Sequence, residues 1–452
     1  MNKFVAFFYI DYGDPAYGLM AEMMVASVKM TMPDYKVALL TDASPTNIAG
    51  IDLKLSADVK FERNKLMPAR MILINAFVGQ YEDAQIILAD PDILFTRPVE
   101  LFDTEYDVGL TWRGNYPSMP FNTGIMTSTT SERAKKFWSF ASDICQTLPA
   151  ETQNWYGDQL SVALIVGLNA FSERESDVIK AGKTNVKLLP GEKYNFSPNT
   201  LENQSADILH LKGDRKKLMI EYFTEMCKTY MGINNGLFSL TDETVELLLL
   251  QRTGYNDILK NDKDDSRNLL SVKLTIDSFN EFNQLIPHLP SHAKNVLDIG
   301  CGLGGIDYFF HKHYKTDDVE IHLLDKDEVS ENIYFGFQNE AASYNSLDAS
   351  RQMLEDAGVE KERIHTYDMK TTDFPVNKEF DVIYSSLSWG FHYPIETYLN
   401  EVKQTLSSDG CLILDMRKDM ANYAVLQAHF PHISVLVDTI KYQRVCARKN
   451  AV

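Results

Sequence analysis

The sequence predicts two α/β domains, each built on a largely parallel sheet, with a helical connector between them. Strand-like apolar runs alternate with helical patterns from both ends of the chain, which is the signature of βαβ units. A chain of 452 residues is too long for one typical core. A polar stretch with two glycines, residues 231–239, interrupts the alternation. We therefore expect a first domain over residues 1–230, a linker and helical extension over 231–290, and a second domain over 291–452.

The first domain opens with a regular series of elements. Strands are expected at residues 4–10, 35–41 and 84–88, with amphipathic helices at 19–32 and 67–78. The last of these strands runs into Asp90-Pro91-Asp92, and the alternation is less clear from there to about residue 223.

The second domain follows two predicted helices, residues 241–251 and 269–286. Its strands are expected at 295–299, 319–324, 381–385, 411–414, 434–439 and 443–447.

Composition and charge exclude several classes of protein. A net charge of −19 offers no broad basic surface, so nucleic acid is not expected as a partner. The chain has neither an apolar run of about 18 residues nor the pattern of a secretory signal. Five scattered cysteines favour reduced thiols over disulfides or a zinc site. We expect a cytoplasmic protein without a membrane span, which could reach the inner face of a membrane only through partners.

A glycine-rich turn follows the first strand of the second domain. Residues 296–305 read Val-Leu-Asp-Ile-Gly-Cys-Gly-Leu-Gly-Gly, and a helix is expected from about Ile306. Glycines let the backbone approach a ligand, which the helix amino terminus then faces. The spacing of Gly300, Gly302 and Gly305 also satisfies the dinucleotide pattern G-x-G-x-x-G. Asp298 argues against a dinucleotide, because a carboxylate repels a pyrophosphate but suits an amino group and a sulfonium.

Two further acids follow in order along the chain. Asp325 ends the next strand, where a carboxylate can accept hydrogen bonds from both hydroxyls of a ribose. Asp368 follows the third strand, at the place of a polar residue that contacts an adenine. The alternative is a generic Rossmann-like domain without a methyl donor, but three markers in order favour the methyl donor.

From about residue 290 to 450 the chain resembles class I methyltransferases. The resemblance implies a Rossmann-like fold and S-adenosylmethionine as the cofactor. It also implies that the cofactor site is lined by Asp298, Gly300, Gly302, Gly304 and Asp325, with Asp368 at its adenine end.

An aromatic loop, residues 388–394, follows the fourth strand of this domain. It reads Ser-Trp-Gly-Phe-His-Tyr-Pro and resembles a family of sugar O-methyltransferases. Ligands of open α/β sheets bind beyond the carboxyl ends of the strands, so this loop should face the transferring methyl group. His392 is the candidate general base for a sugar hydroxyl, and Asp415 at the end of the next strand is the alternative base or its partner. The alternatives without a catalytic role are that His392 only lines the substrate site and that Trp389 and Phe391 pack in the hydrophobic core.

In the first domain, Asp90-Pro91-Asp92 offers two carboxylates to a hard divalent cation. Taken alone the triplet is weak, since turns rich in Asp and Pro are common at surfaces. Four later segments strengthen it, namely residues 98–102, 121–126, 157–159 and 188–195, followed by His210-Leu-Lys-Gly-Asp-Arg-Lys216.

In that order these segments resemble GT-A glycosyltransferases of the glycogenin-like, retaining group, over about residues 1–225. The resemblance implies a nucleotide-sugar donor, UDP-linked in this group, and Mn²⁺ or Mg²⁺ held by Asp90, Asp92 and His210. It places Lys212, Gly213 and Lys216 against the diphosphate with Arg70 as a helper, and Asn122, Asp158 and Gln159 against donor sugar and acceptor. A buried structural histidine is the alternative for His210.

The chain departs from this group at two points. Pro91 replaces a small middle residue, and Lys217-Leu218 replaces the usual Pro-Trp ending. The departures leave open whether the sugar is transferred with retention or inversion.

The sequence thus favours a bifunctional enzyme of glycan assembly in polysaccharide biosynthesis. Its first domain would transfer a sugar to a glycan or glycolipid acceptor, and its second would methylate a sugar hydroxyl. One alternative keeps the methyltransferase and makes the first domain a non-catalytic glycan-binding module. Another is methylation of a protein, lipid or small metabolite. The sequence does not name the donor sugar, the acceptor or the oligomeric state.

Overall fold

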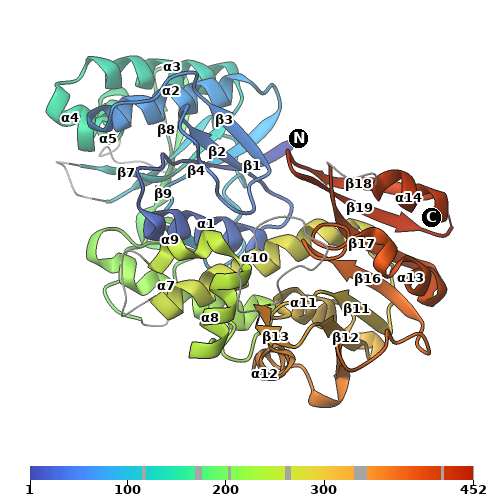
Figure 1. Ribbon diagram of the computed structural model, residues 1–452. Coiled ribbons are helices and arrows are strands. Elements are labelled where there is room, and N and C mark those ends of the chain that lie inside the picture. The colour runs from blue at the N-terminus through green and yellow to red at the C-terminus, as the bar shows by residue number, and fades with distance from the viewer. Residues whose placement is uncertain are drawn as a thin grey trace. The chain divides into compact units, whose positions relative to one another are not determined.

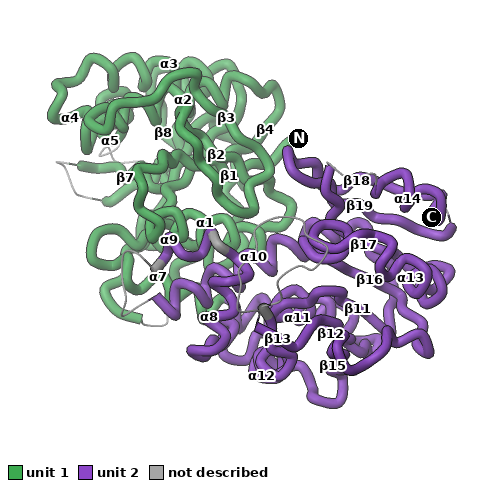
Figure 2. The backbone as a smooth tube through the Cα atoms, in the orientation of Figure 1, with its two compact units in different colours: residues 1–226 green, residues 227–452 purple. Residues whose placement is uncertain are grey.

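A computed structural model describes residues 1–114, 119–167, 176–201, 205–259, 266–329, 344–418 and 422–450. The chain forms two compact units, Met1–Met226 and Cys227–Val452, coloured green and purple in Figure 2.

Unit 1 is built on an eight-stranded sheet with the order β3-β2-β1-β4-β7-β6-β9-β8 (Figure 1). Its strands are β1 (Asn2–Phe8), β2 (Lys36–Thr41), β3 (Leu53–Ser56), β4 (Ala84–Ala89), β6 (Val108–Trp112), β7 (Phe121–Thr129), β8 (Val178–Ala181) and β9 (Thr184–Pro190). The first four in this order are parallel, whereas β7 pairs antiparallel with both β4 and β6. A separate antiparallel pair, β5 (Ile93–Phe95) and β10 (Ile208–His210), lies after the carboxyl end of β4 in the chain.

The helices of unit 1 begin and end where local sequence directs. They are α1 (Pro15–Thr31), α2 (Leu66–Gly79), α3 (Glu132–Thr147), α4 (Ala150–Trp155), α5 (Gly157–Val166), α6 (Gly191–Tyr194) and α7 (Leu218–Met226). Asp14 caps α1 by accepting from the amides of Ala16 and Tyr17, and Pro15 supplies a preset φ at the first helical position. The central strands β1 and β4 are mostly apolar and buried, because both faces of the sheet are covered.

Unit 2 has a seven-stranded sheet with the order β15-β12-β11-β16-β17-β19-β18. The strands are β11 (Asn295–Ile299), β12 (Glu320–Asp325), β15 (Ile364–Asp368), β16 (Phe380–Ser385), β17 (Leu406–Arg417), β18 (His432–Asp438) and β19 (Tyr442–Arg448). The pairs from β15 to β17 are parallel, and β19 is antiparallel to both of its neighbours. The strand order reverses next to β11, so the carboxyl ends of β11 and β16 flank the expected ligand crevice.

The helices of unit 2 are α8 (Asp242–Gln251), α9 (Asn256–Leu259), α10 (Ser266–Leu285), α11 (Gly305–His313), α12 (Leu347–Ala357), α13 (Leu399–Thr405) and α14 (Asn422–His429). A short antiparallel pair joins β13 (Glu328–Val329) and β14 (Tyr344–Asn345). Thr241 and Thr244 form a reciprocal capping box at the start of α8.

The predicted fold class is confirmed, since each unit is a Rossmann-like α/β layer structure. The assignment of a helical connector and of one activity to each domain stays a prediction. All five cysteines are buried and unbridged. Among the described residues, no helix has both the length and the hydropathy that a membrane crossing requires.

Candidate functional site

The glycine loop of unit 2 connects β11 to α11 and adopts a backbone that side chains disfavour. Gly300, Gly302 and Gly304 have φ values of 76°, 53° and 75°. A Cβ atom on Gly300 would overlap the side chain of Ser388, and one on Gly302 would lie 3.0 Å from Gln251 Oε1. Ser388 and Gln251 therefore border the loop, and glycine is required there for both conformation and space.

Asp325 at the end of β12 reaches this loop. Its Oδ2 accepts from the amide of Gly302 at 3.0 Å and from Asn345 Nδ2 at 2.9 Å, and its Oδ1 accepts from the amide of Lys326 at 2.8 Å. Burial raises the pKa of Asp325 to about 6, although these hydrogen bonds act to lower it. At pH 7 the carboxylate is therefore mostly ionised, and its oxygens can accept from hydroxyl donors such as those of a ribose. Asn345 was not predicted from the sequence.

Asp298 and Asp307 are two buried carboxyl groups beside the loop, with 2% and 0% of their surfaces exposed. Asp298 Oδ1 and both carboxyl oxygens of Asp307 have no hydrogen-bond partner among the described residues. Burial and Asp307 raise the pKa of Asp298 well above its usual range, and burial raises that of Asp307 to about 7. Unpartnered buried acids of this kind fit a ligand that brings a cationic group. Asp307 was missed from the sequence, because an acid in the first turn of a helix is ordinary there.

Asp368 ends β15 and pairs in register with Asp325. Its carboxylate accepts from the amides of Asp327 at 3.2 Å and Lys370 at 3.0 Å and from Thr371 Oγ1 at 3.0 Å. These local contacts stabilise a turn. They also lower the pKa of Asp368, and the hydrogen bond from the Lys370 amide contributes most to this shift. Its role at an adenine stays a prediction.

The aromatic loop 388–394 divides into buried and accessible residues. The Trp389 side chain is fully buried, and its indole N–H donates to the carbonyl of Ile395 at 2.9 Å. Trp389 is therefore a core residue and does not stack on a ligand. Phe391 and His392 are half-buried, and their rings lie 4.8 Å apart in an edge-to-face arrangement. Burial and Arg417 lower the pKa of His392, so its imidazole is neutral at pH 7 and able to accept a proton.

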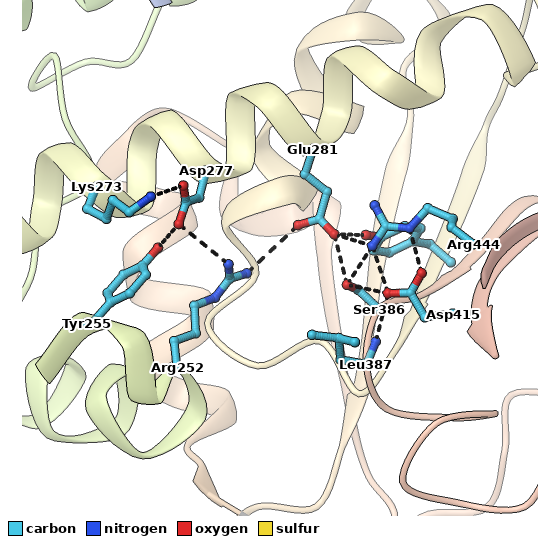
Figure 3. A network of polar contacts seen from close by, with 10 residues as sticks. Arg252, Tyr255, Lys273, Asp277, Glu281, Ser386, Leu387, Asp415 and Arg444 are labelled. Atoms are coloured by element: carbon cyan, nitrogen blue, oxygen red, sulfur yellow. Dashed lines mark hydrogen bonds and ion pairs between the residues drawn. The ribbon is translucent and has the colours of Figure 1, made fainter. Parts of the chain in front are cut away.

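Asp415 belongs to a buried ion cluster, shown in Figure 3. Arg444 on β19 donates from Nε to Asp415 Oδ1 at 2.7 Å and from Nη2 to Oδ2 at 2.8 Å. The same Nη2 donates to Glu281 Oε1 on α10 at 2.6 Å. Burial alone would raise the pKa of Glu281, but Arg444 and Arg252 lower this pKa to about 2. The Oδ2 atom of Asp415 also accepts from Ser386 Oγ and from the amide of Leu387, so this carboxyl group positions the Ser386–Leu387 segment. Its role as a base or as the partner of a base stays a prediction.

The cluster continues along α10 as a chain of alternating charges (Figure 3). Arg252 lies 3.9 Å from Glu281 and 4.0 Å from Asp277, and Asp277 accepts from Lys273 at 2.7 Å and from Tyr255 at 2.5 Å. The charges therefore compensate, and they fix α10 against the carboxyl ends of β16 and β17. The sequence did not reveal this cluster.

Replacement of Arg444 by methionine should lower the free energy of unfolding by about 3 kcal/mol, because it removes the cation of buried Asp415 and one of the two cations of Glu281. Urea denaturation followed by tryptophan fluorescence would measure the change. Arg267→Met is the matched control, since Arg267 pairs with Asp242 at the surface and should contribute less than about 1 kcal/mol. Equal effects of the two substitutions would contradict a structural role for the buried cluster.

In unit 1, three predicted metal ligands converge. Asp90 follows β4, Asp92 precedes β5, and His210 is the last residue of β10, where it pairs with Ile93. His210 Nε2 lies 3.3 Å from Asp92 Oδ1 and 3.7 Å from Asp90 Oδ2. One oxygen or nitrogen atom from each residue could therefore reach a single ion.

Asn195 orients the imidazole of this group. His210 Nδ1 lies 2.7 Å from Asn195 Oδ1, and because that oxygen can only accept, Nδ1 carries the proton. This tautomer leaves the lone pair of Nε2 directed at the two carboxylates, as in metal-bound histidines. Asn195 Nδ2 donates in turn to Asn122 Oδ1 at 3.0 Å, so the Asn122 side chain supports the ligand group. Its predicted contact with a donor sugar stays a prediction.

Arg70 forms ion pairs with both Asp90 and Asp158 in unit 1. It is buried and lies 2.8 Å from Asp90 and 2.6 Å from Asp158, and it donates to the carbonyl of Thr123 at 2.7 Å. Asp158 also accepts from Thr123 Oγ1 at 2.7 Å. Beside it, Gln159 Oε1 is buried without a hydrogen-bond partner among the described residues, so it is available to a ligand donor.

Basic residues lie near the two carboxylates. Burial, Arg113 and Arg215 lower the pKa of Lys212, while Asp92 and Asp90 oppose the shift. Gly213 begins a 3₁₀ turn (Gly213–Lys217) with a φ of 62°, and Lys216 Nζ lies 4.5 Å from the ring centre of Tyr17. Cations gathered beside a metal-type ligand group suit a diphosphate.

Glu320, His322 and His365 form a second cluster of metal-ligand type at the amino ends of β12 and β15. Lys378 Nζ already lies 3.2 Å from Glu320, and both ring nitrogens of His322 have partners, Tyr367 at 3.0 Å and Asn295 at 3.1 Å. Glu320 and His322 therefore have partners within the protein, whereas His365 Nε2 is buried without a hydrogen bond to any described residue and lies 3.3 Å from Glu320 Oε2.

Comparisons with known proteins identify the class of unit 2. Residues 276–445 match the Methyltransferase small domain family. The carboxy-terminal unit is therefore a class I methyltransferase domain, an enzyme class that uses S-adenosylmethionine. No curated protein matches the chain.

Three solved structures with similar folds are distant. A precorrin-6y C5,15-methyltransferase from Geobacter metallireducens is 14% identical, with a TM-score of 0.28 over 38% of this chain and 88% of its own. A glycosyltransferase involved in glycosylation of the major capsid of PBCV-1 is 12% identical, with a TM-score of 0.35 over 48% and 98%. The apo-form glycosyltransferase GlyE of Streptococcus pneumoniae is 14% identical, with a TM-score of 0.33 over 85% of both chains. Similarity at this level gives no information on substrates.

Proposed function

We propose that the chain is a bifunctional glycan-assembly enzyme. Unit 1 would carry out metal-dependent glycosyl transfer from a nucleotide sugar, in a fold of the GT-A type, and unit 2 would methylate a sugar hydroxyl with S-adenosylmethionine. The convergence of Asp90, Asp92 and the oriented Nε2 of His210 is the observation that carries the first activity. A glycan or glycolipid is the acceptor that both activities can share, and tethering would raise the effective concentration of one site's product at the other.

In unit 2, the chain's own residues would bind and align the reactants. S-adenosylmethionine supplies a methyl group that its sulfonium has already activated. Asp325 and the glycine loop would hold the ribose and the amino acid part, with Asp298 beside the latter. The half-buried Phe391 would contact the sugar, and neutral His392 would take the hydroxyl proton as the new C–O bond forms.

We expect His392→Gln to lower kcat for methyl transfer about a hundredfold, because the hydroxyl then loses its positioned base. Since burial and Arg417 lower the pKa of His392, the wild-type rate should stay constant at neutral pH and fall only below pH 6.5, as the imidazole gains a proton. The measurement is transfer of labelled methyl to a panel of sugars across this range. His292→Gln is the control, since its side chain is 82% exposed. A variant with unchanged kcat would leave His392 with a lining role only.

In unit 1, Asp90, Asp92 and His210 would hold a divalent cation, which would supply positive charge to stabilise the leaving diphosphate. Lys212, Lys216 and the amide-rich turn at Gly213 would bind the same phosphates. Gln159, with its unpartnered oxygen, would accept from a hydroxyl of the donor sugar or the acceptor.

The proposal is tested by hydrolysis of a panel of nucleotide sugars with and without Mn²⁺, alongside binding of S-adenosylmethionine by the same protein. Manganese-dependent release of nucleotide from one donor would establish unit 1 as an enzyme and identify its sugar. Absence of release from every donor, with the methyl donor still bound, would overturn glycosyl transfer and leave the methyltransferase.

One observation favours a second candidate, in which unit 1 is a non-catalytic glycan-binding module. Arg70 lies 2.8 Å from Asp90 and neutralises part of the charge that a metal would require. Isothermal titration with Mn²⁺ distinguishes the two candidates, because a binding module of this kind would take up no ion at Asp90, Asp92 and His210.

A further inference from the structure

Two carboxyl groups in unit 2 are buried together without a visible counter-ion. Asp298 lies near the end of β11 and Asp307 in the first turn of α11. Asp307 Oδ2 would lie 3.5 Å from a Cβ on Gly304, so this carboxyl group is placed against the glycine loop. Together they present three buried oxygens without a hydrogen-bond partner among the described residues.

The surroundings make two negative charges here unfavourable. Asp325 on β12 and Glu281 on α10 are the other acids that act on Asp298, and the buried thiol of Cys301 lies close enough for both carboxyl groups to raise its pKa. Arg444 and Arg252 compensate the charge of Glu281. The helix amino terminus favours a charge on Asp307, but burial outweighs it. One proton shared between the two carboxyls removes a charge and supplies the missing hydrogen bond.

We propose that Asp298 and Asp307 form a proton-sharing pair that receives the ammonium group of the methyl donor, and that binding exchanges the shared proton for this cation. The inference rests on S-adenosylmethionine being the ligand of unit 2. On binding, one carboxyl O–H bond breaks, the proton passes to the buffer, and ammonium N–H groups donate to the freed carboxylate oxygens. Once the shared proton has gone, the three donors of an ammonium match the three buried oxygens that have no partner outside the pair among the described residues. Asp307 is thereby a cofactor-binding residue that the glycine motif does not include.

Isothermal titration calorimetry at pH 6.5, in two buffers of different ionisation enthalpy, counts the released protons. S-adenosylhomocysteine carries the ammonium group, whereas 5′-methylthioadenosine has the same nucleoside without it. The first ligand should release between about half a proton and one proton, and the second none. The affinity for S-adenosylhomocysteine should also rise about five- to tenfold from pH 6 to pH 7, because fewer molecules then retain the proton.

Asp307→Asn should remove both the proton release and this pH dependence while 5′-methylthioadenosine binds as before, which shows that the variant is folded. Asp348→Asn is the matched control, as the Asp348 side chain is 94% exposed in the same unit, and it should behave as wild type. Binding of S-adenosylhomocysteine without proton release, or release that persists in Asp307→Asn, would overturn the carboxyl pair but leave the methyltransferase assignment. Failure of the wild type to bind either ligand would overturn the cofactor assignment and the inference with it.

Discussion

Asp92→Asn should reduce Mn²⁺-dependent release of nucleotide from the donor sugar by at least about a thousandfold. Asp92 is nearly buried, with 10% of its side chain exposed, and its Oδ1 is the carboxylate oxygen nearest to His210 Nε2. Asparagine keeps the shape but removes the charge that holds a hard cation. Asp90 cannot compensate, because Arg70 already occupies one of its oxygens.

The measurement is nucleotide release at increasing Mn²⁺ concentration, with Asp143→Asn on the exposed face of α3 as the control. Because the change lies in unit 1, unaltered binding of S-adenosylhomocysteine by unit 2 shows that the effect is confined to unit 1, and the far-ultraviolet circular dichroism of the variant should match that of the wild type. A variant that releases nucleotide as fast as wild type would remove Asp92 from the metal site. Recovery at high Mn²⁺ would instead show weakened affinity with intact chemistry.

Periodicity was sufficient to predict β1, β2 and β4 of unit 1 and most strands of unit 2, since buried parallel strands are apolar runs that differ from amphipathic helices. It did not predict β3, β6, β7, β8 or β9 of unit 1. The edge strands β3 and β8 are short and lack a long apolar run, and β7 is rich in polar residues although it is buried. It also placed the start of the fifth strand of unit 2 at Cys411, whereas β17 begins at Leu406. The intervening residues are polar, and backbone pairing rather than side-chain burial extends the strand.

Residues that stand at strand ends could be predicted as site candidates, because the topology brings those ends together. Asp90, Asp92 and His210 are brought together in this way, although His210 lies far along the chain from the other two. Residues that act through a distant partner could not be predicted. Glu281 and Arg444 are 163 positions apart, and neither belongs to a motif.

Aromatic residues were the least informative signal, since stacking on a ligand and packing in a core call for the same side chains. Trp389 was expected in a substrate loop, yet it is fully buried and its indole N–H is satisfied by Ile395. The neighbouring His392 was the more informative residue, because partial burial of an imidazole is unfavourable unless the side chain has a structural or functional role.

Gly300→Ala should weaken binding of S-adenosylhomocysteine at least about a thousandfold, the second of the two largest effects that we expect. Gly300 has a φ of 76°, which an alanine adopts only with strain. Its new methyl group would also overlap both Oγ and Cβ of Ser388, so a rotation of the hydroxyl cannot relieve the clash. The loop would have to move away from the position in which Asp325 holds the amide of Gly302.

Calorimetric titration with S-adenosylhomocysteine measures this loss, and Gly254→Ala in the same unit is the control, since nothing lies within 4 Å of a Cβ there. The double variant Gly300→Ala/Ser388→Gly separates the two causes. Removal of the Ser388 side chain should restore part of the affinity, and the remainder is the cost of the left-handed backbone. If the double variant binds no better than Gly300→Ala, the steric explanation is wrong and backbone strain alone accounts for the requirement for glycine. If Gly300→Ala binds as wild type, the glycine loop does not hold the cofactor in the conformation described here.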